Sequence, residues 1–225
     1  MRYKFDFPVE TVNRLRKMFT AALLLGCALG TTPHAAAQHI AAPTTPAAIT
    51  APPGTSVFLV GHATGTQGYV CLPQTSGASW TANAARPEAA LFTDFFGQPV
   101  QIITHFLSPV TSPNENAPSV LAFGNATWQS SFDSSKVWAQ ASGSITAGSD
   151  PSCPNDGAIP CLLLQAIGSD KGPGGGKLLT KTTYIQRLHT KGGAAPADGC
   201  AIPADVGKQA LVSYTADYYF YRGNQ

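Results

Sequence analysis

The amino-acid sequence predicts an all-β domain, mainly antiparallel, folded as a single-domain sandwich or barrel with at most one or two short helices. Short runs rich in β-branched and aromatic residues recur along residues 56–222, and clusters of Gly, Pro, Asn and Ser separate them. No long run has the 3.6-residue period of an amphipathic helix. The last run alternates between two kinds of side chain, which is typical of a strand with one buried face.

The expected strands follow one another along the chain, with turn clusters between them. Their β-branched and aromatic residues fit a pleated, half-buried surface. Segments 108–118 and 150–157 are rich in Pro, Asn, Ser and Gly and are expected to form turns. In chain order, the predicted strands are Ser56–Val60, Gln67–Leu72, Val100–Leu107, Val120–Phe123, Lys136–Ala141, Ile159–Ala166, Leu178–Leu188 and Ala210–Tyr221.

Two stretches of the chain carry a more specific prediction. One helix is expected at Ala84–Asp94, where Pro87 followed by Glu-Ala-Ala-Leu suits the first turn of a helix. In the last strand, one parity is apolar or aromatic throughout and should face the core. That parity consists of Val212, Tyr214, Ala216, Tyr218 and Phe220.

The N-terminal residues 1–37 are interpreted as a signal peptide. Basic residues at positions 14–17 precede a short apolar run, Met18–Gly30, and the small residues Ala35–Ala37 follow it. A membrane-spanning helix needs about 20 apolar residues, and this run is shorter. We expect cleavage after Ala37 and a secreted or periplasmic location. The alternative is a lipid anchor at Cys27, because Leu24–Cys27 resembles the bacterial lipobox.

Two further regions follow this segment. Residues 38–55 are rich in Ala, Thr and Pro and are predicted to be a poorly ordered leader. Residues 56–225 are predicted to be one β-rich domain.

Removal of residues 1–37 changes the charge and the cysteine count. The segment holds five of the 14 basic residues and two of the 12 acidic ones, so nine basic and ten acidic residues remain and the net charge of +2 becomes −1. No basic cluster is left for a nucleic acid. Four of the five cysteines remain. An even number in an exported chain predicts two disulfides, with three possible pairings.

Several blocks of the mature chain occur in the order of a known family. They are Gly65–Cys71, Trp80 with Arg86–Phe92, His105-Phe106, Trp128 with Asp133–Val137, Ile159–Leu164, Tyr184–Arg187, Thr190–Pro196, Gly199-Cys200 and Tyr214–Tyr221. Together they resemble exported bacterial and fungal proteins catalogued as domain of unknown function 3455. The resemblance supports the domain boundaries and implies no established activity.

The resemblance also implies a disulfide pairing. Cys71 and Cys200 lie in two of the family's blocks and are expected to form its shared disulfide. Cys161 stands where the family pattern has Trp, and Cys153 lies eight positions earlier across a turn. We therefore expect a second, local disulfide between Cys153 and Cys161.

Three residues are weak catalytic candidates. His105 and His62 lie in or next to predicted strands, and imidazole serves as a general base or a metal ligand. Asp133 could pair with His105, although an Asp in a turn more often bonds its own backbone. Asp217 falls on the outward parity of the last strand, where Arg187 or Arg222 could neighbour it. The structural interpretation is preferred for all of them.

Exposed aromatic residues are the other candidates for function. Trp128, Tyr219 and Tyr221 could stack on sugar rings, although tryptophans in a small β domain more often anchor the core. Trp80 and Trp138 belong to the same set. The segment Gly172–Lys177 lacks the first Gly and the Ser/Thr of a phosphate-binding loop. We expect no cofactor, and no metal-ligand spacing is present.

The leading hypothesis is therefore a non-catalytic binding or cell-envelope-associated module that contacts envelope polysaccharide through aromatic residues. The alternative is an extracytoplasmic hydrolase or metal-dependent enzyme that uses His105 with Asp133 or His62.

Overall fold

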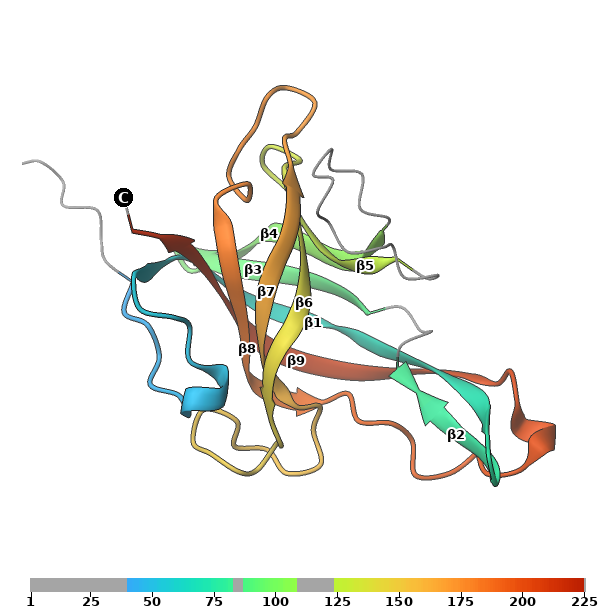
Figure 1. Ribbon diagram of the computed structural model, residues 1–225. Helices are drawn as coiled ribbons and strands as arrows, with labels where there is room; N and C mark the ends of the chain where they lie inside the picture. Colours follow the sequence, from blue (N-terminus) through green and yellow to red (C-terminus); the bar gives the residue numbers. More distant parts are fainter. Residues whose placement is uncertain (1–39, 83–86, 109–123, 225) are drawn as a thin grey trace, which may run out of the picture. The chain divides into compact units, whose positions relative to one another are not determined.

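The computed structural model describes residues 40–82, 87–108 and 124–224 and consists mainly of antiparallel strands (Figure 1). The predicted signal peptide and Cys27 lie outside the described residues. The strands are β1 (Thr55–Gln74), β2 (Gly77–Thr81), β3 (Glu88–Phe95), β4 (Gln98–Ser108), β5 (Asn125–Ser130), β6 (Lys136–Ile145), β7 (Cys161–Asp170), β8 (Thr182–Gly192) and β9 (Gln209–Gly223). Two 3₁₀ turns accompany them, η1 (Ala47–Ile49) and η3 (Pro203–Asp205). The predicted all-β class is confirmed.

The nine strands form one sheet that closes on itself. Neighbouring strands pair in the order β2-β1-β3-β4-β5-β6-β7-β8-β9, and β1 also pairs with β9. All these pairs are antiparallel. Eight strands therefore make a closed barrel, and β2 extends the part of β1 that runs beyond it beside β9 (Figure 1). Closure leaves the ring without an unpaired edge.

The side chains of β9 alternate as predicted. Tyr214, Ala216, Tyr218 and Phe220 are buried and belong to the main core cluster, whereas the intervening residues point to the outer face. Residues that pair directly across two strands have their side chains on the same face of the sheet. Ala63 of β1 pairs with Ala216 and therefore also faces inward. Each strand thus has one inward set of side chains.

Several predicted elements have different bounds. The helix expected at Ala84–Asp94 is wrong, because residues 88–95 form β3, which pairs with β1 and β4. The two strands expected at 56–60 and 67–72 are parts of the continuous β1. The strand expected to start at Leu178 starts at Thr182. The strand expected at Val120–Phe123 lies outside the described residues.

The segment predicted to be a poorly ordered leader is packed on the outer face of the ring from residue 45 to 51. Ile49 is fully buried in a second cluster with Leu163 and Leu188. The amide of Gln186 donates to the Ile49 carbonyl at 2.5 Å. Disorder was predicted because the segment has few large side chains, but burial of the single residue Ile49 is enough to hold it against the ring.

Two disulfides connect parts of the chain. Cys71 pairs with Cys200 across 129 positions, and Cys153 pairs with Cys161 across eight. The first ties the extended end of β1 to the segment between β8 and β9. The two disulfides fit a location outside the cytoplasm. No helix in the described ranges is long and apolar enough to cross a membrane.

The inside of the ring is filled unevenly. Near the β3–β4 turn, large apolar side chains pack together without exposure, namely Leu91, Ile103, Val137, Ile185 and Phe220. Toward the end where β4 stops and β5 begins, the inward positions include the small residues Ala126, Ala139 and Ala141. This difference in side-chain volume leaves a hollow at that end.

Candidate functional site

The hollow is a cavity of about 460 Å³ inside the ring. Its lining residues come from β1 and from all strands from β4 to β9. We call it the interior cavity. Its lining residues are Gln67, Ala82, Pro87, His105, Leu107, Gly124, Asn125, Ala126, Trp128, Ala139, Gln140, Ala141, Leu162, Leu164, Arg187 and Tyr218.

Three aromatic rings form one wall of the interior cavity. His105 on β4 and Trp128 on β5 are paired across the two strands. Their rings stack with centroids 4.2 Å apart and an interplanar angle of 8°. Tyr218 contacts both rings, with centroid distances of 5.8 Å to His105 and 6.0 Å to Trp128. These contacts fix the orientation of the wall.

His105 is held as a neutral imidazole. Its Nδ1 lies 2.9 Å from the carbonyl oxygen of Thr127, which can only accept, so Nδ1–H donates and Nε2 carries the lone pair. Burial lowers the pKa of His105 to about 4, and the nearby Arg187 charge adds to this effect against the opposing hydrogen bond. At neutral pH the ring therefore presents an acceptor nitrogen and an apolar face.

The polar lining residues carry hydrogen-bond donors without partners. Trp128 is 1% exposed and Asn125 is 6% exposed. The indole Nε1–H of Trp128, the amide Nδ2 of Asn125 and the Nε–H of Arg187 are buried and have no hydrogen-bond partner among the residues that the structure describes. A buried donor without a partner costs about 1–3 kcal/mol, so three of them on residues that line one cavity are an unusual arrangement.

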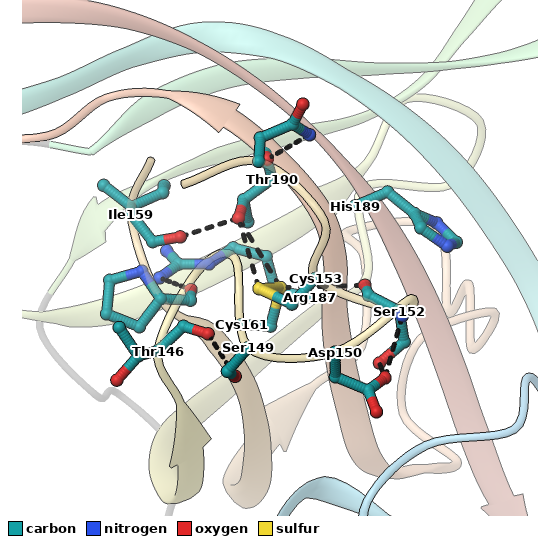
Figure 2. Close-up of a disulfide and its surroundings, with 12 residues drawn as sticks. Thr146, Ser149, Asp150, Ser152, Cys153, Ile159, Cys161, Arg187, His189 and Thr190 are labelled. Carbon is teal, nitrogen blue, oxygen red and sulfur yellow. Dashed lines mark hydrogen bonds between the residues drawn. A yellow bond between two sulfur atoms is a disulfide. The ribbon is translucent and has the colours of Figure 1, made fainter. Parts of the chain in front are cut away.

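Arg187 is the one charged residue that lines the interior cavity among the described residues. One of its terminal nitrogens donates to the Pro160 carbonyl at 2.8 Å, just before the cysteine of the local disulfide. Figure 2 shows Arg187 beside Cys153 and Cys161, where the Thr190 hydroxyl lies 3.6 and 3.5 Å from the two sulfur atoms. The disulfide thus stabilises the segment that holds the guanidinium.

The structure does not bring the three catalytic candidates together. Because Gly65, Ala89 and His105 are paired across β1, β3 and β4, His105 faces inward. His62 lies on the opposite parity of β1 and is exposed on the outer face. The strand alternation that the sequence revealed for β9 therefore separates these two histidines.

Asp133 organises the turn between β5 and β6. Its Oδ1 accepts from the backbone amide and the hydroxyl of Ser135 at 3.1 and 2.7 Å, and its Oδ2 accepts from the Leu178 amide at 2.8 Å. Desolvation raises the pKa of Asp133, but these hydrogen bonds outweigh it and lower the pKa from 3.8 to about 2. The carboxylate thus joins this turn to the β7–β8 loop.

The predicted aromatic platform is not assembled on the surface. Trp128 lines the interior cavity, and Tyr221 is 2% exposed with its hydroxyl donating to Gln186. Tyr219 is half-buried on the outer face, against the cluster that holds Ile49. The prediction was wrong for Tyr221 because the segment before β1 packs over that part of the outer face.

The other two tryptophans have structural partners. Trp138 is fully buried and donates Nε1–H to the Ser108 hydroxyl at 2.9 Å. Trp80 on β2 donates to the Asp198 carbonyl at 2.9 Å, close to the Cys71–Cys200 disulfide.

A second polar cluster lies on the outer face. Asp217 accepts from His62 Nδ1 at 2.6 Å and from His189 Nδ1 at 2.9 Å. Arg187, suggested as its neighbour, faces inward opposite Tyr218, and a register shift after Leu188 brings His189 to Asp217 instead. Within the described ranges, no group of three or more His, Cys, Asp or Glu side chains could hold a metal ion.

Sequence reasoning did not identify Arg187, Asn125 and Tyr218 as members of one site. The inward parity of β9 already included Tyr218, and pairing of β8 with β9 would have placed Arg187 on the same face. That pairing depends on strand register, which a bulge in β8 shifts and which the sequence does not reveal.

Comparison with models of protein families identifies the family of this chain. Residues 52–222 match the model of a family described as "Protein of unknown function (DUF3455)". The search of curated proteins and the search of solved structures found no match.

Proposed function

The chain belongs to the DUF3455 family of proteins of unknown function, and we propose that its β-barrel is a non-catalytic binding module that holds a small molecule in the interior cavity. The observation that carries this proposal is the cavity of about 460 Å³, with its aromatic wall and its donors without partners. Small-molecule sites commonly measure 300–1,000 Å³ and combine apolar walls with a few polar groups.

The architecture supports the same proposal. An eight-stranded barrel is just wide enough either to be filled by side chains or to hold one small ligand. Here the half near the β3–β4 turn is filled, and the half lined by Ala126, Ala139 and Ala141 is hollow. A site inside the ring suits a small molecule better than a polysaccharide chain, which needs an open surface.

The burial of His105 favours binding over catalysis. A general base works best when its pKa lies near the working pH, and burial lowers the pKa of His105 to about 4. The Nδ1 of His105 donates to a main-chain carbonyl, and its ring is stacked on Trp128. We assign His105 the role of a neutral wall residue with one acceptor nitrogen.

The proposal is tested by filling the cavity. Matched carboxylate and carboxamide probes (acetate, benzoate, 2-naphthoate and decanoate, each with its amide) are titrated into the mature protein by calorimetry. We expect at least one probe to bind, and Ala126→Phe to reduce its affinity at least about tenfold by occupying the space. The control Ala204→Phe changes an exposed residue of η3 and should leave binding unchanged.

Two results would contradict the proposal. One is the absence of binding by every probe, and the other is binding that Ala126→Phe does not weaken. Circular dichroism of both variants establishes that they are folded. A smaller replacement, Ala126→Leu, gives a second measurement if the phenylalanine variant does not fold.

We propose that the domain acts outside the cytoplasm, in the periplasm or the medium, after cleavage following Ala37. The support is the pair of disulfides together with the signal-like composition of residues 1–37. Intact-mass analysis of the exported protein tests this location. A chain that starts at Gln38 is expected, whereas an acylated chain that starts at Cys27 would show envelope anchoring instead.

A further inference from the structure

The charge of the interior cavity indicates what kind of molecule it binds. Arg187 is the one charged side chain among its described lining residues, and no acidic side chain accompanies it there. The ion pairs among the described residues join His62 and His189 to Asp217 and Lys208 to Asp205. An arginine inside a protein is ordinarily paired with an acid, because a partly buried charge without a partner is costly.

The donors of the interior cavity agree with this charge. Trp128 and Arg187 are at inward positions of β5 and β8 and carry an indole and a guanidinium N–H without partners in the described part of the chain, and the lining residue Asn125 carries an amide N–H of the same kind. All three are donors, so the ligand group that satisfies them must accept hydrogen bonds. A carboxylate has two oxygens with about four acceptor positions and no donor, and it bonds to guanidinium groups in a fixed geometry.

The position of the guanidinium is fixed before any ligand binds. The bond from Arg187 to the Pro160 carbonyl uses one terminal nitrogen and leaves the buried Nε–H unpaired. The rest of the cavity wall is apolar, with the His105–Trp128 stack, Leu162 and Leu164. The site therefore has a cationic, donor-rich part and an apolar part.

We propose that the interior cavity selects small carboxylates with an apolar body and that Arg187 binds the carboxylate group. This inference rests on the proposed binding function. The apolar body contacts the His105–Trp128 stack, and the carboxylate accepts from Arg187 and from the unpartnered donors. Arg187 is thus the residue that determines specificity.

The preference is measured with the same carboxylate and carboxamide pairs. Each pair has the same carbon skeleton and differs in charge, so the ratio of affinities reports the interaction with Arg187. We expect a carboxylate of at least one pair to bind the wild-type protein about 10- to 100-fold more tightly than its amide. Arg187→Gln should bring this ratio close to one, because it weakens binding of the carboxylate more than binding of the amide.

Two variants serve as controls. Arg222→Gln removes an exposed arginine at the far end of β9 and should preserve the ratio. Arg187→Lys keeps the charge but loses the planar fork, so an intermediate ratio is expected. The wild-type ratio by itself remains a test if Arg187→Gln does not fold.

The outcomes separate this inference from the proposed function. Equal affinity of acids and amides, lost on Ala126→Phe, would overturn the carboxylate preference and leave the binding function standing. A preference that Arg187→Gln does not change would overturn the role of Arg187. Failure of every probe to bind would overturn both.

Discussion

Single residues in this domain have functions that their sequence context leaves open. Asp133 is a candidate acid by residue type, but its two oxygens accept from Ser135 and Leu178 on different segments. His105 is a candidate base by residue type, but the inward parity of β4 places it on Trp128. In both cases the partners, and not the residue type, determine the role.

Asp133→Asn is expected to destabilise the domain by about 1–3 kcal/mol, because the new amide group faces an N–H donor instead of accepting from it. Urea unfolding measures this loss, with Asp198→Asn, which changes an exposed side chain, as the control. An unchanged midpoint for Asp133→Asn would show that the carboxylate does not organise the turn.

The lowered pKa of Asp133 should also make the stability of the domain depend on pH. Its pKa is 3.8 ordinarily and about 2 in the folded protein, so its contribution is complete above pH 4 and is lost as pH falls toward 2. The free energy of unfolding of the wild type should fall across this window. Asp133→Asn should remove that part of the acid dependence, and an equally steep slope in the variant would contradict the assignment.

Burial of His105 should make the domain lose stability as the pH falls below 6.5, a window that lies above the one expected for Asp133. Its pKa falls from 6.5 to about 4 on folding, so the unfolded chain takes up a proton below pH 6.5 while the folded protein does not. The stability should decrease between pH 6.5 and 4 by on the order of 3 kcal/mol. His105→Gln is expected to flatten this region, whereas His62→Gln on the outer face should leave the His105-dependent decrease in place.

At the scale of elements, pairing overrides local propensity. Glu-Ala-Ala-Leu in β3 favours a helix by composition, yet β1 and β4 provide hydrogen-bonding partners on both sides. Ala89 and Leu91 then alternate into the core, which stabilises the strand more than the helix propensity of these residues opposes it. Long-range pairing of this kind is not visible in a local sequence window.

The segment before β1 depends on a glycine of β6. A Cβ atom at Gly143 would overlap the carbonyl oxygen of Ala48 in η1, so only glycine allows this close approach. Gly143→Ala is expected to cost about 1–3 kcal/mol and to raise hydrogen exchange in residues 45–51. Gly223→Ala is the control, because a Cβ there meets no atom within 4 Å. Unchanged exchange in residues 45–51 would contradict the dependence.

At the scale of the whole molecule, the two disulfides should contribute unequally. On the chain-entropy model, the Cys71–Cys200 bond across 129 positions is worth about 5 kcal/mol and the Cys153–Cys161 bond across eight about 2.5 kcal/mol. Replacing both cysteines of a pair by alanine should therefore lower the denaturation midpoint more for the first pair. The reverse order would show that the local disulfide acts mainly by holding the Pro160 segment.

The closed ring is what creates the candidate site. Its walls come from strands between residues 67 and 218, and only the pairing of β1 with β9 brings the first and last of them together. A sandwich, the other architecture that the sequence allowed, would have packed the same apolar faces against each other without this cavity. The candidate binding site is therefore a property of the tertiary structure and is not visible in the sequence.

The sequence alone determined the all-β class and the inward parity of β9. These features are local, because alternation does not depend on which strands are neighbours. The tertiary structure decided that the sheet closes, that Arg187, Asn125 and Trp128 meet at one cavity, and that His105 is separated from His62 and bonded to a main-chain carbonyl. These features depend on register and closure, which arise from contacts between residues far apart in the chain.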